Sequence, residues 1–380
     1  MLTNENLHSG SLRRTPSEAG EIDQADSSYT NDTPIEPQWS PESFPPSKSH
    51  LVSVVIPAFN AEATINDTLK SVRSQTHLNL EIIVVDDGST DRTGSIVESH
   101  ASCDPRVTLI SQTNAGVAAA RNTGWRSARS DLIAFVDADD LWAPSKIEKQ
   151  LEVMLAGGER VGLVYTWFSV IDERNRIRAI GPVRRIEGDV IKNALGNNFI
   201  GNASSPLIRR RVLEEVGGYD SSLRSAGAQG CEDMQIYYRI ALRSHFGLVP
   251  EHLTGYRVVA RRMSSDRLRM LRSFSLVADE MKRNHPESAE KIDAGVRYYL
   301  HFLLGEALAF HDFGQAWSLL SLLRSSVGWD SVTYLTTVFR HKYRGFGIFV
   351  WRHLRRLGKS LAGRSAESVE PIFPFGESQH

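Results

Sequence analysis

Four short apolar runs, separated by helix-like stretches, constrain the fold of this chain more than any other feature. The runs are Leu51–Pro57, Leu80–Val85, Val107–Ile110 and Asp131–Val136. The stretches between them, with apolar residues at helical spacing, cover residues 62–75, about 91–100 and 117–128. Strands that alternate with helices at this spacing predict βαβ units, and therefore a parallel sheet with helices on both faces.

Polar residues follow three of the predicted strands, where such a sheet binds its ligands. They are Pro57–Asn60, Asp86–Ser89 and Asp137–Asp140. Asp137 and Asp139 alternate along an extended segment and so face the same way, as a divalent cation and its bridged phosphate oxygens require. The alternative is a solvated strand end, with Asp139 or Asp140 capping a helix that Pro144 begins. Three strand ends together favour a ligand site.

Composition narrows the function classes. The net charge of −1 gives no whole-chain argument for nucleic-acid binding, and we expect no nucleic-acid partner. Cys103 and Cys231 are too few for a disulfide framework or a cysteine zinc site, which fits a reducing compartment. Neither a signal peptide nor a bilayer-spanning stretch is found, so we expect a cytoplasmic protein. Dinucleotide and phosphate-loop fingerprints are missing, so a phosphate-bearing ligand would depend on a metal.

The two ends of the chain call for separate interpretations. Residues 1–50 hold eight acids, three bases and nineteen Ser, Thr or Pro, and we expect a disordered acidic tail. Residues 266–364 are expected to be helical and to pack on the catalytic domain or on a second copy as a homodimer. Within them, residues 346–361 form a basic amphipathic pattern, which fits either an anionic membrane surface on the cytoplasmic side or an ordinary docked helix. Residues 365–380 are expected to be a second tail.

Four ordered motifs resemble the inverting family 2 glycosyltransferases of GT-A fold. They are Val52–Asn60, Ile82–Asp91, Asn114–Asn122 and Phe135–Asp140. The resemblance continues through Ile208–Asp220 and covers about residues 51–260. It implies an α/β GT-A (nucleotide-diphospho-sugar transferase) fold, with a mostly parallel central sheet flanked by helices and a helical C-terminal extension. The catalytic domain would span residues 51–265, with a nucleotide-sugar half at 51–142 and an acceptor half at 143–265.

The resemblance also implies a donor pocket. Its expected lining residues are Pro57, Ala58, Phe59 and Glu62 at the first strand end, and Asp86 and Asp87, which would bind base and ribose. Asp87 is the first choice for the base, whereas tight-turn chemistry is the alternative for this pair. Arg121 and Asn122 lie on the helix predicted at residues 117–128, where the Arg121 cation would face the diphosphate or sugar, unless Arg121 merely snorkels or pairs on a solvated helix face.

The remaining implied roles concern a divalent cation and the general base of the transfer reaction. Asp139 would ligate Mn²⁺ or Mg²⁺, Asp137 would contact the ribose or a metal-bound water, and Asp140 would cap the following helix. Asp233 would be the base that takes the acceptor proton, with Glu232 orienting it. The alternative is that both acids simply favour the N-terminus of a helix.

The predicted function is metal-dependent inverting transfer of one sugar from a nucleotide-diphosphate sugar to a saccharide or lipid-linked acceptor, in cell-surface polysaccharide or glycolipid biosynthesis. Single transfer is expected because the Gln-x-x-Arg-Trp element and membrane helices of processive synthases are absent. Tyr256–Arg257 and Met263–Ser265 are similar to family residues that close over the donor phosphates. The alternatives are a haloacid dehalogenase-type phosphatase or phosphotransferase, and a non-catalytic nucleotide-sugar binding protein.

Overall fold

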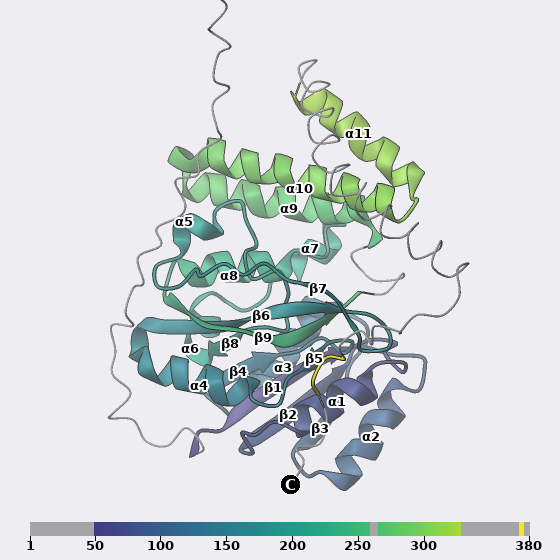
Figure 1. Ribbon diagram of the computed structural model, residues 1–380, viewed down its shortest axis with the longest axis vertical. Helices are drawn as coiled ribbons and strands as arrows, with labels where there is room; N and C mark the ends of the chain where they lie inside the picture. Colours follow the sequence, from purple (N-terminus) through teal and green to yellow (C-terminus); the bar gives the residue numbers. More distant parts are fainter. Residues whose placement is uncertain (1–48, 259–264, 328–371, 376–380) are drawn as a thin grey trace, which may run out of the picture. The chain divides into compact units, whose positions relative to one another are not determined.

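The computed structural model describes residues 49–258, 265–327 and 372–375, all within the unit Pro41–His380 (Figure 1). The tail predicted for residues 1–50 therefore lies almost wholly outside the described residues, and so does the basic segment 346–361.

The predicted alternation of strands and helices is present in the first half of the chain. Its elements are β1 (Val52–Ala58), α1 (Ile65–Arg73), β2 (Leu80–Asp86), α2 (Thr93–Cys103), β3 (Val107–Ser111), α3 (Val117–Ser127) and β4 (Leu132–Phe135). β1 pairs in parallel with both β2 and β4, and β2 pairs in parallel with β3. Every residue of β1 and β2 is buried, as expected of central strands covered on both faces.

The second half adds the antiparallel part of the sheet. Its elements are β5 (Leu141–Trp142), α4 (Lys146–Ala156), β6 (Val161–Ile171), β7 (Ile177–Ile180), α5 (Ile191–Ala194), β8 (Leu207–Arg209), α6 (Arg210–Glu215), α7 (Ser222–Ser225), α8 (Glu232–Ala241) and β9 (His245–Arg257). In the described part of the chain, nine strands form one sheet in the order β3-β2-β1-β4-β8-β6-β9-β5, with β7 paired to β6. Pairs β4–β8, β6–β8, β6–β7 and β5–β9 are antiparallel, so the sheet is mixed.

Two apolar clusters cover the two faces of this sheet. Because side chains alternate along a strand, Val54 and Ile56 of β1 enter one cluster and Val55 enters the other. The first cluster takes in residues of α1, α2 and α4, and the second takes in residues of α3, α6 and α8. The expected α/β architecture with helices on both faces is confirmed.

The C-terminal extension is helical through residue 327, as predicted. It contains α9 (Arg267–Asn284), α10 (Ala289–Ala309) and α11 (Phe313–Val327). Figure 1 shows α9 and α10 side by side beyond α8, and a cluster including Tyr238, Phe274 and Ile292 joins these three helices. Within residues 49–258, 265–327 and 372–375, none of the helices combines the length and apolar character needed to cross a bilayer.

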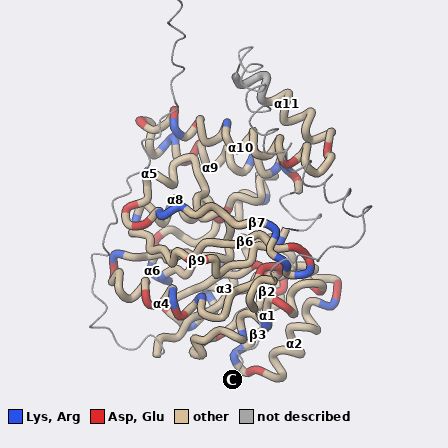
Figure 2. Tube along the Cα trace, viewed as in Figure 1, with Lys and Arg blue, Asp and Glu red and all other residues tan. Residues whose placement is uncertain are grey.

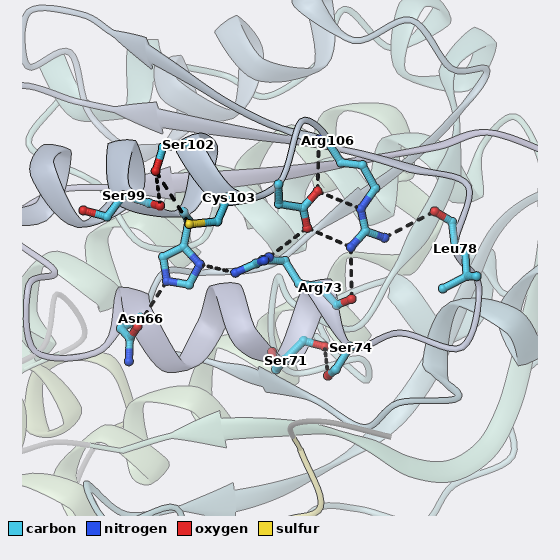
Figure 3. Close-up of polar contacts among 11 residues, drawn as sticks. Asn66, Ser71, Arg73, Ser74, Leu78, Ser99, Ser102, Cys103 and Arg106 are labelled. Atoms are coloured by element: carbon cyan, nitrogen blue, oxygen red, sulfur yellow. Dashed lines mark hydrogen bonds and ion pairs between the residues drawn. The ribbon is translucent and has the colours of Figure 1, made fainter. Parts of the chain in front are cut away.

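A buried polar network joins α1 to the turn after α2 (Figure 3). The Asp104 carboxylate accepts hydrogen bonds from Nε of Arg73 at 2.8 Å and from Nη2 of Arg106 at 2.9 Å. These bonds, above all those from Arg106, hold the pKa of Asp104 well below its ordinary value against the opposing effect of burial. His100 contacts Arg73 and Asn66 in the same network.

One part of the predicted tail at residues 365–380 is not loose. Phe373 is 1% exposed and belongs to the apolar cluster on the α1 and α4 side of the sheet. Residue 372 forms an antiparallel bridge with Arg176. The prediction is therefore wrong for Ile372–Phe375. The Phe373 ring packs in an apolar cavity that exists only once the sheet has folded, so the local sequence does not reveal it.

Candidate functional site

The carboxyl ends of β1, β2 and β4 meet at one edge of the sheet, as the sequence predicted. Ala58 pairs with Asp86 at the ends of β1 and β2, and the Asp87 amide donates to the Ala58 carbonyl at 2.8 Å. The end of β4 is anchored beside them, because the Val136 amide donates to the Val55 carbonyl. Parallel pairing of neighbouring strands therefore brings the three polar segments together.

The segment after β1 is tied to the loop after β2. Pro57 and Ala58 are buried in the strand, whereas Phe59 is 52% exposed. The Glu62 carboxylate accepts hydrogen bonds from the backbone amide and from Nε of Arg92. Glu62 thus holds the two loops together, and the exposed Phe59 ring is the apolar surface that the segment offers to a ligand.

Asp86 and Asp87 are buried and organise the loops around the strand ends. Asp86 accepts from the Ser89 amide at 2.9 Å, which is the turn chemistry considered above. Asp87 accepts from the side chain of Gln112 at 2.7 Å and from the Ala115 and Gly116 amides at 2.8 Å. A carboxylate offers about four acceptor positions, so Asp87 orders the loop ahead of α3 and keeps capacity for one further donor.

Arg121 of α3 is the central cation of the site. It is 3% exposed, its Nη2 donates to Oδ1 of Asp137 at 2.6 Å, and its guanidinium lies 5.2 Å from the centre of the Tyr219 ring. Burial opposes the charged form, but Asp137 and other neighbours hold the pKa of Arg121 above its ordinary value. The interpretation of Arg121 as a solvated helix residue is wrong, because α3 turns this side chain inward.

Asn122, the neighbour of Arg121, has a structural role. Its side-chain amide donates to the Tyr219 carbonyl, and its oxygen accepts from the Tyr219 amide. It therefore fixes the position of Tyr219 beside Arg121.

Asp137 and Asp139 are half-buried in the turn after β4, where the Asp140 amide donates to the Asp137 carbonyl at 3.0 Å, and they form the candidate metal centre. The prediction that they alternate along an extended segment is therefore wrong, because the chain turns directly after β4. The Asp137 amide donates to Oγ of Ser204 at 3.0 Å, and the Asp139 carbonyl accepts from Nε of Arg257 at 2.6 Å. Within the described chain no three His, Cys, Asp or Glu side chains gather as a metal-binding group. A divalent cation would therefore need oxygens from its ligand, as Mg²⁺ does when bound by one or two carboxylates plus phosphates.

Two buried hydrogen-bond donors support the binding of an anionic ligand beside Asp137 and Asp139. Nε of Arg121 and Nη2 of Arg257 are buried and find no hydrogen-bond partner among the described residues. Buried polar groups without partners are costly in proteins. A diphosphate would supply oxygens to such donors, so the residues present fit a metal-bound diphosphate.

Asp140 does not cap a helix, contrary to the prediction. Its carboxylate accepts from Oγ of Ser204 at 2.5 Å and from the Arg257 amide at 2.8 Å. The next element is the short strand β5, and α4 begins only at Lys146. Burial, with Asp139 and Asp137 adding to it, raises the pKa of Asp140. Asp140 therefore joins β4, β9 and the loop before β8, contacts that no local pattern reveals.

Glu232 and Asp233 begin α8, where acids also suit the positive end of a helix. Asp233 accepts from the Asn198 side chain at 3.0 Å and from the Met234 amide at 2.7 Å. Burial raises the pKa of Asp233, the Asp137 charge raises it further, and Arg121 and Asn198 oppose the rise. Burial likewise raises the pKa of Glu232, opposed by Arg121. The start of α8 thus lies within the field of Arg121 and Asp137.

Several residues of the site escaped sequence reasoning. Tyr219 lies against Arg121, Asn198 bonds to Asp233, and Ser204 bonds to Asp140. Arg224 of α7 lies over Gly116, because a Cβ built on Gly116 would come within 2.9 Å of its Cδ. Asn198, Ser204 and Arg224 belong to none of the motifs identified in the sequence. Only Tyr219 had a signal, since it belongs to the Ile208–Asp220 segment of the resemblance.

Comparisons with known proteins show which proteins the chain is similar to. Residues 53–217, which are less than half of the chain, match the model of Glycosyl transferase family 2. The match includes β1 to α6 and the candidate metal and donor residues, and it ends before Glu232 and Asp233.

Curated relatives are glycosyltransferases by name. A Haemophilus influenzae glycosyltransferase is 37% identical over 151 residues, which are 39% of this chain and 59% of the relative. TuaG of Bacillus subtilis, named for teichuronic acid biosynthesis, is 29% identical over 62% of this chain and 90% of its own. The UDP-Glc:α-D-GlcNAc-diphosphoundecaprenol β-1,3-glucosyltransferase WfgD of Escherichia coli is 34% identical over 38% of this chain and 56% of its own. The chain thus spans little more than half the length of two of these relatives.

Solved structures show the same fold. A mannosyltransferase from Pyrobaculum calidifontis in complex with GDP-Man and Mn²⁺ has a TM-score of 0.52 at 20% identity, over 83% of this chain and 86% of that one. S. aureus TarS 1–349 in complex with UDP-GlcNAc has a TM-score of 0.51 at 17% identity, over 66% and 71% of the two chains. The predicted GT-A fold is confirmed.

Proposed function

We propose that this protein is a metal-dependent inverting glycosyltransferase that moves one sugar from a nucleotide-diphosphate sugar to an acceptor hydroxyl. The observation that carries the proposal is the meeting of two segments far apart in sequence. The start of α8, with Asp233, lies within the field of Arg121 and Asp137 at the edge that β1, β2 and β4 create. We infer from this that the candidate base lies beside the candidate donor site.

The donor would lie along the strand ends. Phe59 offers an exposed ring to the base, and Asp87 offers its remaining acceptor capacity to a base N–H or a ribose hydroxyl. Nε of Arg121 and Nη2 of Arg257, which have no hydrogen-bond partner among the described residues, would donate to the oxygens of the diphosphate. A divalent cation held by Asp139, with Asp137 on its donor side, would supply Lewis-acid stabilisation of the departing diphosphate.

Asp233 would act as the base. Its carboxylate takes the proton of the acceptor hydroxyl as that oxygen attacks the anomeric carbon, and the bond from this carbon to the diphosphate oxygen breaks. Burial raises the pKa of Asp233, which makes the carboxylate a stronger base while Arg121 and Asn198 favour its ionised form. Glu232 accepts from the Gly230 amide and thereby fixes the turn that presents Asp233.

The relatives suggest the acceptor class. The names of TuaG and WfgD refer to teichuronic acid biosynthesis and to a diphosphoundecaprenol-linked sugar. We therefore place this chain in cell-surface polysaccharide or glycolipid biosynthesis, with a saccharide or lipid-linked acceptor. A phosphatase of the haloacid dehalogenase type is not favoured, because its nucleophilic aspartate follows the first strand, whereas Asp137 follows β4.

Thermal stabilisation tests the donor site. The full chain is heated with Mn²⁺ or Mg²⁺ and each of a panel of UDP-, GDP-, ADP- and dTDP-sugars. We expect one donor class to raise the melting temperature only when metal is present, and Asp139→Ala to abolish that metal dependence. Asp131→Asn, an exposed acid at the opposite end of β4, is the matched control. If no nucleotide sugar raised the melting temperature, the proposal would be refuted.

Transfer tests the base. Asp233→Asn should retain donor stabilisation and lose roughly 10²- to 10⁴-fold in transfer rate, the range of general-base catalysis. Full transfer by this variant would show that Asp233 is not the base. Donor binding by the wild type without transfer to any acceptor or water would favour a nucleotide-sugar binding protein. Polymer formed from donor alone would contradict single transfer.

The location of the protein in the cell is a prediction. We propose a cytoplasmic enzyme that contacts an anionic membrane through residues 346–361, which lie outside the described residues. Removing residues after about 340 should release the protein from anionic vesicles in a sedimentation assay. Unchanged sedimentation would contradict the membrane contact, and mass measurement in solution would decide on a homodimer.

A further inference from the structure

The short segment Ile372–Phe375 packs on the catalytic unit, although residues 328–371 separate it in sequence from α11 (Figure 1, yellow). Phe373 is 1% exposed, whereas its neighbour Ile372 is 63% exposed. Phe373 shares an apolar cluster with residues of β5, β6 and β9, and the partly buried Phe375 packs against the same cluster. One aromatic side chain therefore anchors the segment.

The segment is held by its backbone as well as by this ring. The Phe373 amide donates to the Asn175 carbonyl at 2.9 Å, and residue 372 forms an antiparallel bridge with Arg176. On β9, a Cβ added to Gly255 would lie 3.1 Å from two atoms of the Phe373 ring. The absence of a side chain at Gly255 thus makes room for this ring, as in recognition of an extended peptide by a strand edge and a side-chain pocket.

The turn that receives the segment leads directly to the candidate metal centre. This turn, Asp172–Arg176, joins β6 to β7, and Figure 2 shows acidic and basic positions gathered beside β7. The Asp172 carbonyl accepts from Nη1 of Arg257 at 2.8 Å. Arg257 in turn donates from Nε to the Asp139 carbonyl at 2.6 Å and from its amide to Asp140 at 2.8 Å.

We propose that Ile372–Phe375 is an intramolecular latch that positions Arg257, and through it the backbone of Asp139. Phe373 is a positioning residue, and the groove beside Gly255 is a binding site for an aromatic peptide whose occupant is the C-terminal segment of the same chain. The docked segment fixes the Asp172–Arg176 turn, this turn orients the Arg257 guanidinium, and Arg257 holds the strand end that carries Asp139. The consequence for metal binding rests on the proposed function, whereas the mechanical coupling does not.

Hydrogen exchange in the full chain without ligand tests the coupling. Phe373→Ala is compared with Ile372→Ala, which alters the exposed neighbour. In Phe373→Ala we expect exchange of the Arg257 amide to accelerate about 10- to 100-fold, a range consistent with losing one buried aromatic side chain. The Ile82 amide, which bonds to the Arg106 carbonyl on the far side of the sheet, should be unchanged. Equal Arg257 exchange in the two variants would overturn the proposal.

A second variant guards against general misfolding of Phe373→Ala. Gly255→Ala crowds the ring from the opposite side and should accelerate the same amides. The added Cβ would also lie 3.2 Å from Cδ1 of Ile171, so in the Phe373→Ala background Gly255→Ala should add only the effect of this second contact, which is smaller than its effect in the wild type. Full additivity at the Arg257 amide would show that Gly255 and Phe373 act separately and would contradict the latch.

A peptide in trans tests the binding site itself. A synthetic peptide covering residues 370–376 should restore slow Arg257 exchange in the full-length Phe373→Ala variant, and the same peptide with alanine at position 373 should not. No restoration at millimolar peptide would overturn the groove as a binding site.

Metal binding gives the functional readout. Manganese titration in the presence of the stabilising nucleotide sugar should show a raised apparent dissociation constant for Mn²⁺ in Phe373→Ala and an unchanged one in Ile372→Ala. Equal Mn²⁺ affinity in the two variants would refute an effect on the metal site. If the wild type itself bound no donor with Mn²⁺, the proposed function would fail, while the exchange results would still decide the mechanical coupling.

Discussion

Arg121→Met removes the central cation of the site while keeping an unbranched apolar side chain of similar reach. The guanidinium is 3% exposed and pairs with Asp137 at 2.6 Å. Removing one partner of a buried ion pair typically costs about 3–5 kcal/mol. The Asp137 side chain is 29% exposed, so water can replace part of the lost bond. We therefore expect a loss in the free energy of unfolding of about 3 kcal/mol at neutral pH, near the lower end of that range.

The loss should depend on pH with a defined sign. Burial raises the pKa of Glu232 and of Asp233, and Arg121 opposes both shifts. Without Arg121 both folded-state values rise further, whereas the unfolded-state values stay near about 4. A raised folded-state pKa contributes stability that is present at low pH and is lost as pH rises through it. The destabilisation by Arg121→Met should thus be smallest below about pH 4 and should grow above it, by about 1.4 kcal/mol for each unit of added pKa shift.

Urea unfolding between pH 3.5 and 8, a window set by these carboxyl values, measures the effect. Arg126→Met is the matched control, because this exposed arginine of the same helix stacks on Trp125 and should cost no more than about 1 kcal/mol. Adding Asp233→Asn to Arg121→Met should recover part of the stability at pH 8. A loss that is constant across the pH range, or one no larger than that of Arg126→Met, would refute the assignment of Arg121 as the cation that keeps these acids ionised.

Three further predictions address other contacts. Asn198→Ala removes a hydrogen bond to ionised Asp233, so the pKa of Asp233 should rise and the acid limb of the kcat/KM profile should move to higher pH; an unmoved limb would contradict this contact. Asp104→Asn breaks the network in Figure 3 and should cost about 3 kcal/mol at neutral pH in urea unfolding. Because the folded-state pKa of Asp104 is lowered, this cost should shrink as pH falls below about 4; a constant cost would refute it. Asp140→Ala should destabilise by about 2–4 kcal/mol, since the Ser204 hydroxyl and the Arg257 amide lose their acceptor, and an effect below 1 kcal/mol would refute its anchoring role.

The first half of the fold was predictable because its determinants are local. Short β-branched runs, helical spacing and strand-end acids all recur within about 30 residues, and parallel pairing then places Asp86, Asp87 and Asp137 at one edge. The four motifs carried the resemblance and with it the GT-A fold, which the comparisons confirm. No strand after β4 was predicted. Strands β5, β7 and β8 have only two to four residues, too few for a readable period, and the longer strands β6 and β9 were missed as well.

The errors concern side chains whose partners are distant in sequence. Asp140 was assigned to a helix cap because a nearby helix was the only partner that sequence offered, whereas its partners are Ser204 and Arg257. Phe373 was assigned to a tail with the rest of residues 365–380, whereas its cavity is made by β6 and β9.

Sequence by itself therefore determined the parallel part of the sheet, the edge at which the candidate site lies and the acids at that edge. Only the tertiary structure decided how those acids differ: Asp137 pairs with Arg121, Asp140 braces the sheet, and Asp233 comes under the influence of both Arg121 and Asp137. The physical reason is that the place of a strand end follows from local pattern and pairing. The ionisation and role of a carboxylate depend instead on burial and on charges brought close by folding.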